Sequence, residues 1–282
     1  FLSLRDLALS RQVCTFFEAY WQEKFDGNVL PLRVGNDVAT INQVMGVIEI
    51  LSSRREFTKA SPFVVLLGKG EHEVTSSWTF PGGVCQTTLN ITRSNISFVG
   101  QGIGETIILG GISIPNVQNI TLKQMTLTNT NGRGIFLLSS EVALVDVATI
   151  NCHSTGIMVH IYVWSAAAGA SQLVATRCEM SNNHGSGLHI FNSNNNISPN
   201  VCLKNCISHH NSSGISSVGK GVIHLYGEAT AIHSNRINGI HVNTFGKVVI
   251  HLPSNHNTLY NNTHGDRFTI GGGTITNVHV ED

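Results

Sequence analysis

Carboxylates and imidazoles are the side chains of this sequence that could do chemistry, and the carboxylates are scarce where the chain is most regular. Between residues 119 and 270 the acids are only Glu141, Asp146, Glu179, Glu228 and Asp266. Enzymes that hydrolyse glycosides use two carboxyl groups roughly 5–10 Å apart, and so few acids disfavour such a pair. The chain has 14 histidines, but no two have the spacing of a zinc-binding helix motif and no carboxylates are interleaved with them. The sequence therefore predicts no metal and no cofactor.

One oppositely charged pair, Asp146 and Arg177, falls at the same position in two successive copies of a repeat, with Gln124 and Asn205 in the flanking copies. If each copy is one coil of stacked strands, neighbouring strands lie about 4.8 Å apart, and the two side chains can touch. One interpretation is a surface ion pair that contributes little to stability. The other is catalytic, with Arg177 as a base and Asp146 as the group that orients it.

A second set of residues predicts a binding surface. These residues alternate with inward-pointing ones, so they should point outward from successive strands and form an exposed strip: Phe136, Met158, His160, His189, Phe191 and His241. An exposed apolar strip with flat rings suits a peptide or a glycan. In the alternative interpretation the insertion over residues 162–170, which contains Trp164, folds across part of the strip.

The element that must position these residues is a repeat built on a Gly-Ile-x-Val phrase. Its glycines are 22, 31, 27 and 25 residues apart: Gly134, Gly156, Gly187, Gly214 and Gly239. Short alternating apolar runs at such a period, with polar corners, indicate a solenoid of stacked strands. The pairs that should stack in its core are Ile135/Leu137, Ile157/Val159, Leu188/Ile190 and Ile240/Val242. Asn129, Asn151 and Asn182 precede corner glycines by five residues and predict a ladder of stacked amides that bonds leftover backbone groups.

The first 60 residues lack this repeat and favour helices. Asp37 can cap a helix over residues 38–51, whose apolar face is Ile41, Val44, Met45, Ile48 and Leu51. An amphipathic helix over the open end of a strand stack would keep the core from water. Three regions are thus predicted: a helical segment over 1–29, a linker with the capping helix over 30–60, and the solenoid over 61–282.

The start of the solenoid resembles that of a known superfamily. A helix followed by Val64-Val65-Leu66-Leu67-Gly68-x-Gly70, Ile96-x-Phe98-Val99-Gly100-x-Gly102 and Thr106-Ile107-Ile108 is similar to the first coils of right-handed parallel β-helix, or pectin-lyase-like, proteins. These include pectate lyases, polygalacturonases, alginate epimerases, viral tailspikes and the β-helix domains of some F-box proteins. The resemblance implies an all-β solenoid, a single-stranded right-handed parallel β-helix with an N-terminal α-helical cap. The chain departs from the enzymes: it has no Asp-Asp and no Asp-Pro-His-Asp, and its His184-Gly185-x-Gly187 matches the polygalacturonase Gly-His-Gly only loosely.

Residues 1–29 carry a second resemblance. Leu4-x-Asp6-Leu7, Val13-Cys14-x-x-Phe17 and Trp21 resemble the second half of an F-box. In that family this helical pair docks onto the adaptor subunit of a cullin-type ubiquitin ligase, so the resemblance implies a substrate receptor for ubiquitination. The alternative is a helical cap with an ordinary apolar face.

The amino-acid composition limits the classes of binding partner and indicates a cellular compartment for the protein. Acids and bases are equal in number, 17 each, so there is no electrostatic case for nucleic acid, and no apolar run approaches the ~20 residues that span a bilayer. The six cysteines show neither paired spacing nor a zinc pattern, and we interpret them as unpaired core residues: Cys14, Cys85, Cys152, Cys178, Cys202 and Cys206. Unpaired thiols favour a reducing, intracellular compartment. Because the chain begins with Phe1, we expect its native N-terminus to lie upstream.

Two functions are compatible with these features. The first is non-enzymatic: a rigid scaffold that presents an outer face to a protein or glycan partner. The alternative is a polysaccharide-active enzyme, namely a uronan lyase, a glycoside hydrolase or a C5-epimerase, which the scarcity of acids disfavours. A flat solenoid face also suits ice binding, but that role requires a regular Thr-x-Thr ladder, and the outward positions here are mixed.

Overall fold

A computed structural model describes residues 31–53, 55–80, 83–161, 171–194, 196–252 and 259–279. The chain divides into two units, 1–31 and 32–282, and the described residues belong almost wholly to the second. The F-box-like pattern of residues 1–29, which includes Cys14, lies outside the described residues. Its role, and the intracellular location, stay predictions.

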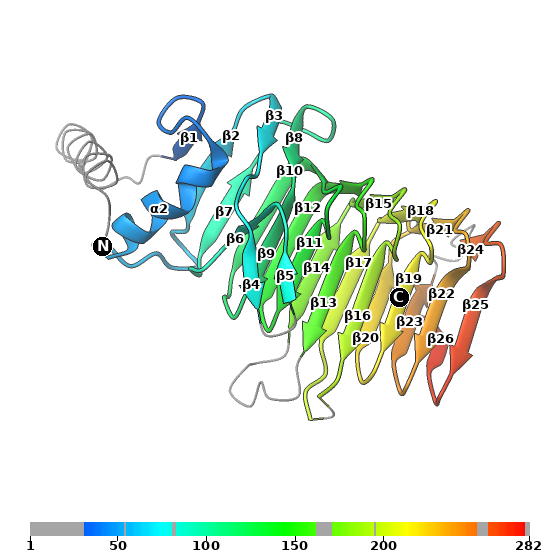
Figure 1. The fold of residues 1–282 in the computed structure, drawn as a ribbon. Helices are drawn as coiled ribbons and strands as arrows, with labels where there is room; N and C mark the ends of the chain where they lie inside the picture. The colour runs from blue at the N-terminus through cyan, green and yellow to red at the C-terminus, as the bar shows by residue number, and fades with distance from the viewer. Residues whose placement is uncertain are drawn as a thin grey trace. The chain divides into compact units, whose positions relative to one another are not determined.

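The second unit is a coil in which each turn of the chain adds one parallel strand to each of two sheets (Figure 1). The long sheet runs β1 (Leu32–Val34), β2 (Phe63–Leu67), β7 (Ile96–Val99), β10 (Ile120–Thr128), β12 (Glu141–Ile150), β14 (Gln172–Thr176), β17 (Asn200–Lys204), β20 (Val222–Tyr226), β23 (Lys247–Leu252) and β26 (Thr274–His279). The eight-stranded sheet runs β6 (Thr88–Asn90), β9 (Gly111–Pro115), β11 (Ile135–Leu138), β13 (Ile157–Ile161), β16 (Leu188–Asn192), β19 (Ile215–Val218), β22 (Asn238–Asn243) and β25 (Gly265–Ile270). This is the right-handed parallel β-helix that the repeat and the resemblance predict.

A bend in each coil adds a third face. Short side strands continue the long sheet beyond the bend: β3 (Gly70–Glu73), β8 (Thr106–Leu109), β15 (Glu179–Ser181), β18 (Ile207–His209), β21 (Ala231–His233) and β24 (Leu259–Tyr260). The bend residue is left-handed in four coils, with φ between 52° and 55° at Gln124, Asp146, Arg177 and Asn205. The long sheet and the side strands therefore present two different outer faces, with Asp146 and Arg177 on the edge between them.

The core forms as the alternation predicts. The residues of the repeated phrase are register partners from coil to coil, as in Ile135 with Ile157 and Ile157 with Leu188. All eight residues predicted to stack inward are buried, none with more than 1% of its surface exposed. Each such side chain contributes about 1.5–3 kcal/mol when it leaves water, so the stack of coils is held mainly by its apolar interior.

The asparagine ladder exists, but two of its predicted members are displaced by one residue. Asn129 is buried and belongs to it. Asn151 and Asn182 instead occupy the left-handed corner position, with φ of 55°, and the next residue points inward. The ladder continues through Cys152, Asn183, Asn211, Asn235 and Asn262. The backbone N–H of each of the first four donates to the amide oxygen of the next member at 3.0–3.1 Å. The corner needs a residue that tolerates positive φ, and asparagine is suited to that position too.

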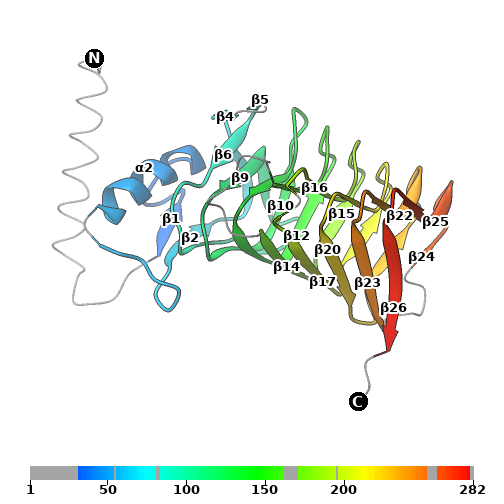
Figure 2. The same ribbon diagram turned by 90° about the horizontal axis from the view of Figure 1, so that it is seen from below.

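The two ends of the coil are closed differently. Helix α2 (Ile41–Ser52) lies beside β1 and β2 (Figure 2) and buries Ile41, Val44, Val47, Ile48 and Leu51. Met45 is only half-buried. The helix starts later than predicted, because Asp37 accepts the Arg33 N–H at 2.7 Å instead of capping it. In the last coil Arg267 is the register partner of Ile240 and donates to Asn277 at 3.1 Å, so polar groups end the apolar core.

The described cysteines are free thiols, as predicted: Cys85, Cys152, Cys178, Cys202 and Cys206. All are buried except Cys202, which is half-buried. Among the described residues, no helix has the length and apolarity needed to cross a membrane.

Candidate functional site: two outer faces of the coil

The six residues predicted to form an exposed strip do lie together, on the outer face of the eight-stranded sheet. Phe136, Met158 and His189 are successive register partners, and so are His160 and Phe191 beside them. His241 continues the first row two strands further, across Ser216. We call this surface the strip face.

The N-terminal end of the strip face is covered, which corrects the prediction that the whole strip is exposed. Phe136 and Met158 have only 1% and 8% of their surface exposed. The cover comes from a two-stranded antiparallel hairpin, β4 (Trp78–Phe80) and β5 (Gly83–Cys85), whose Trp78 ring lies 5.6 Å from that of Phe136. The Arg133 guanidinium lies 5.1 Å from the Phe136 ring centroid. The insertion over 162–170, the predicted cover, lies outside the described residues.

The middle of the strip face is half-buried and uncharged at neutral pH. Burial, with the nearby positive charge of Arg133, lowers the pKa of both His160 and His189 to about 4. His160 packs edge-on against Phe191 at 5.1 Å, and His189 stacks with the same ring at 6.3 Å. Only toward the last coils is this face open: Phe191 is 38% exposed, and His241 packs against the exposed Phe268 at 5.3 Å. The strip face is thus mainly a packing surface at its N-terminal end.

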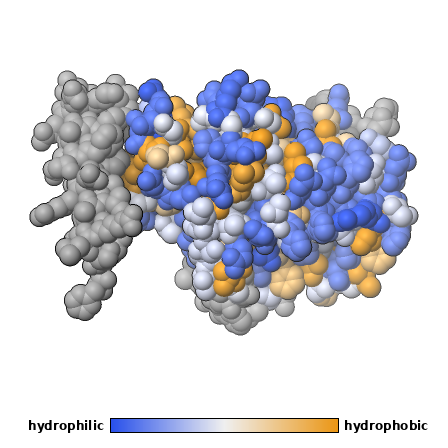
Figure 3. All heavy atoms as spheres, turned by 45° about the horizontal axis from the view of Figure 1, so that its top comes forward, coloured by the Kyte–Doolittle hydropathy of each residue, from blue (hydrophilic) through white to orange (hydrophobic). Residues whose placement is uncertain are grey.

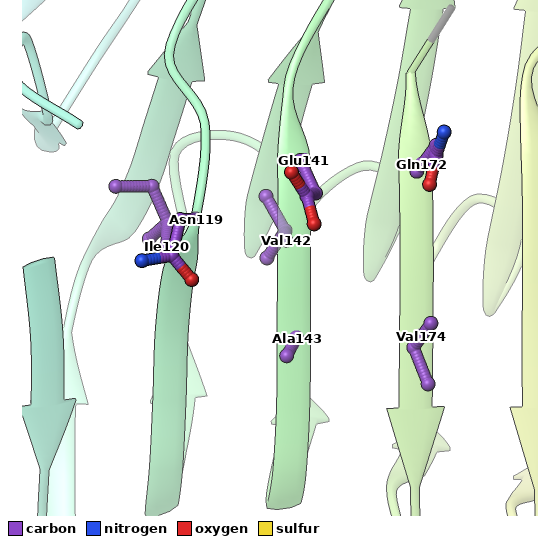
Figure 4. Close-up of a pocket in the computed structure, with 7 residues that line it drawn as sticks. All are labelled: Asn119, Ile120, Glu141, Val142, Ala143, Gln172 and Val174. Carbon is purple, nitrogen blue, oxygen red and sulfur yellow. The ribbon is translucent and has the colours of Figure 1, made fainter. Parts of the chain in front are cut away.

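The outer face of the long sheet is different, and we call it the groove face. A shallow depression with a volume of about 80 Å³ lies at the start of three of its strands, β10, β12 and β14. Figure 4 shows the residues that line it: Asn119, Ile120, Glu141, Val142, Ala143, Gln172 and Val174. Glu141 and Gln172 are register partners at its edge, and Ala143 and Val174 form its floor. The side chains of Ala143 and Val174 are shorter than those of Glu141 and Gln172 beside them, so this part of the sheet surface is concave.

The floor of the depression continues along the coil axis to an aromatic cluster. Val174, Cys202 and His224 are successive register partners. The His224 Nδ1 lies 2.9 Å from the His251 Nε2, and the Tyr226 ring stacks on His251 at 4.0 Å with an interplanar angle of 15°. Burial lowers the pKa of His224 and of His251. A flat ring surface therefore lies at the far end of the groove face, beside the exposed Lys204, which is the register partner of Tyr226.

The predicted ion pair forms along the edge of the groove face. Arg177 donates two hydrogen bonds to Asp146, from Nε and from a terminal guanidinium nitrogen, each at 2.7 Å. These bonds lower the pKa of Asp146 and raise the pKa of Arg177. A base must give up its proton, so the shift of Arg177 runs against the catalytic interpretation. That role stays a prediction.

Metal binding finds no support in the part of the chain that the structure describes, where no group of three histidine, cysteine or acidic side chains could hold an ion. Sequence reasoning missed the depression and the Tyr226–His251 stack. One pattern could have revealed the stack: the two residues are 25 positions apart, which is one period of the repeat. No pattern in the sequence around Trp78 predicts that this residue covers Phe136.

No family model matches the chain, and no curated protein matches it in sequence. Among solved structures, the Agl-KA catalytic domain is similar, with a TM-score of 0.55 and 15% identity over 89% of this chain and 48% of that one. The A-module of the Azotobacter vinelandii mannuronan C-5 epimerase AlgE6 has a TM-score of 0.26 and 12% identity over 86% of this chain and 97% of its own. The catalytic domain of a GH87 alpha-1,3-glucanase, solved in complex with nigerose, has a TM-score of 0.29 and 9% identity over 92% of this chain and 69% of its own.

Of these likenesses, the one to Agl-KA is close enough in shape to show a shared fold, and at 15% identity it shows the fold alone. The chain spans less than half the length of that structure, 48%.

Proposed function

We propose that the protein is polysaccharide-active and that the glycan lies along the groove face. The observation that carries this proposal is the row of outward register partners, Val174, Cys202 and His224, that leads from the depression toward the stacked rings of Tyr226 and His251. Glycan rings have apolar faces that pack on aromatic side chains, and hydroxyl groups that bond to polar side chains at the rim. The fold that this chain shares with a catalytic domain agrees with the proposal.

The distance between the acidic residues of the groove face limits the reactions that it could catalyse. Glu141 and Asp146 both belong to β12, five residues apart. At about 3.3 Å per residue that is roughly 16 Å along the strand, beyond the roughly 5–10 Å that a hydrolase pair requires. A catalytic role is therefore confined to the lyase or epimerase type, in which Arg177 would be the base and Asp146 its orienting partner, and the raised pKa of Arg177 weighs against it. Binding without turnover would make the protein a glycan-presenting scaffold, the other function that the sequence allows.

The first experiment measures affinity for a panel of polysaccharides at pH 7.5: polygalacturonate, alginate, an α-1,3-glucan and pullulan. We expect at least one to bind, and Tyr226→Ala to weaken binding about two- to tenfold, since a lost aromatic contact is worth about 0.5–1.5 kcal/mol. The matched control is Phe268→Ala, which removes an exposed ring from the strip face. The proposal fails if no glycan binds, or if the control loses as much affinity as Tyr226→Ala.

Turnover is measured on the same samples. Absorbance of unsaturated uronate reports a lyase, and new reducing ends report any chain cleavage. If the parent cleaves a uronan, Arg177→Ala should abolish the cleavage. The variant should still bind the glycan, because Tyr226 and His251 are unchanged. Unchanged turnover in Arg177→Ala removes Arg177 from the mechanism. A parent that binds a glycan but neither cleaves it nor changes the configuration of its uronates, as read by proton NMR, leaves the scaffold function.

A further inference from the structure

A histidine-rich surface lies away from the groove face, where the side strands turn into the asparagine corner. Its members come from four successive coils: His153, His184, His209, His210, His233 and Arg236. We call it the imidazole surface. Figure 3, in which the top of Figure 1 comes forward, shows mostly hydrophilic residues on this side of the coil.

The imidazole surface is built from ring contacts between coils. His209 stacks on His233 at 5.1 Å with an interplanar angle of 4°, and His233 stacks on Tyr260 of β24 at 4.7 Å. His153 stacks on His184 at 5.4 Å. A guanidinium nitrogen of Arg236 donates to the His184 carbonyl at 2.9 Å, so its positive charge is held beside the backbone of this corner. Imidazoles thus follow one another along the coil axis, with about 4.8 Å between coils.

Few negative charges face these rings. Glu179 of β15 places a carboxylate oxygen 3.3 Å from the His209 Nε2 and accepts a hydrogen bond from Ser181. The other acids on the adjoining elements are Glu228, which precedes β21, and Asp266 in β25, which accepts a hydrogen bond from Asn262. Burial, with His209 and His210 close by, lowers the pKa of His233, so this ring resists protonation. Protonation of the other imidazoles turns a nearly neutral surface into a cationic one.

One contact shows how protonation would change the surface. The Nδ1 atoms of His209 and His210 lie 2.7 Å apart, which requires one of them to be without a proton so that it accepts. When both rings are charged this hydrogen bond is lost, and His210, which is exposed, can donate to a ligand instead. Histidine is the side chain that changes charge between about pH 5 and 8.

We infer that the imidazole surface binds an acidic polysaccharide when its histidines are protonated. The inference goes beyond the groove face, because the imidazole surface shares no residue with it. An extended chain with one carboxylate per sugar can meet cationic groups that recur along the axis. Uronate carboxylates stay ionised well below pH 5.5, so the pH dependence of binding comes from the protein. Binding takes up protons, because the bound anion favours the charged imidazoles.

The test uses the full chain with polygalacturonate at pH 7.5 and pH 5.5, and far-UV circular dichroism confirms that the fold is kept at both. We expect affinity to rise about tenfold for each proton taken up per pH unit, and to fall in high salt. The variant is His184→Ser with His210→Asn, because the same positions carry Ser212 and Asn182 in neighbouring coils. The control is His72→Gln with His279→Gln, which removes two imidazoles from other parts of the coil.

The increase at pH 5.5 should be clearly smaller in His184→Ser/His210→Asn, which removes two of the five imidazoles, and persist in full in the control. Equal loss in both, or affinity that does not change with pH, overturns the inference. Pullulan, which is uncharged, should show no increase. Tighter binding of poly(U) than of polygalacturonate at pH 5.5 would assign the surface to nucleic acid and overturn the polysaccharide assignment. Failure of Tyr226→Ala to weaken binding at pH 7.5 concerns the groove face alone and leaves this result standing.

Discussion

The strip face and the groove face are built by the same alternation, yet the first is covered at its N-terminal end and the second is open. On the strip face, Phe136 is 1% exposed because the hairpin with Trp78 packs on it. On the groove face, the outward Val174 is 50% exposed and borders a depression. Alternation decides which side chains leave the coil interior. Whether they then reach solvent depends on a segment elsewhere in the chain, so an outward position and an exposed position are different properties.

The largest test of this comparison is the cost of removing one outward side chain from each face. Phe136→Ala should lower the free energy of unfolding by about 3–5 kcal/mol, since it leaves a cavity under Trp78. Val174→Ala should change it by less than about 0.5 kcal/mol. Urea unfolding of the two variants beside the parent measures both. Equal, small changes would mean that the hairpin does not cover the strip face in solution.

A second test uses pH, because the two histidines whose pKa is lowered to about 4 lie on the strip face. The folded-state pKa of His160 and of His189 is about 4, below the unfolded value of about 6.5. The unfolded chain therefore binds more protons between those values, and stability rises with pH across this window and is lost as pH falls through it.

We expect His160→Leu, which copies Leu138 of the neighbouring strand, to weaken the dependence by about 1–3 kcal/mol between pH 7 and pH 4, after allowance for partial exposure. The measurement is the free energy of unfolding at several pH values in parent and variant. His72→Gln is the control, and it should retain the parent's slope. A parent whose stability is flat from pH 7 to pH 4 would mean that the strip-face histidines are solvated.

The same contrast explains what could be predicted from sequence. The coil, its inward residues and the contact between Asp146 and Arg177 follow from spacing, because in a solenoid residues one period apart become neighbours. The cover over Phe136 does not follow from spacing, because the β4–β5 hairpin falls outside the repeat. The ladder shows the limit of spacing at single-residue scale: Asn182 and Asn183 are adjacent and alike, and only the left-handed corner at Asn182 decides which one points inward.

The smallest expected effect is at the edge of the groove face. Asp146→Asn removes the carboxylate that accepts two bonds from Arg177, and should lower the free energy of unfolding by ~0–1 kcal/mol because the pair is solvated. The folded pKa of Asp146 is lowered, so its contribution is present above the unfolded value of about 3.9 and is lost as pH falls through the folded value. The parent and the variant should therefore become equally stable in strong acid, and also in 1 M salt, where screening is nearly complete. The deficit of Phe136→Ala should survive both conditions, because it arises from packing. A deficit of Asp146→Asn that persists in 1 M salt would show that the edge of the groove face is shielded from water, and the two faces would then differ less than their exposures indicate.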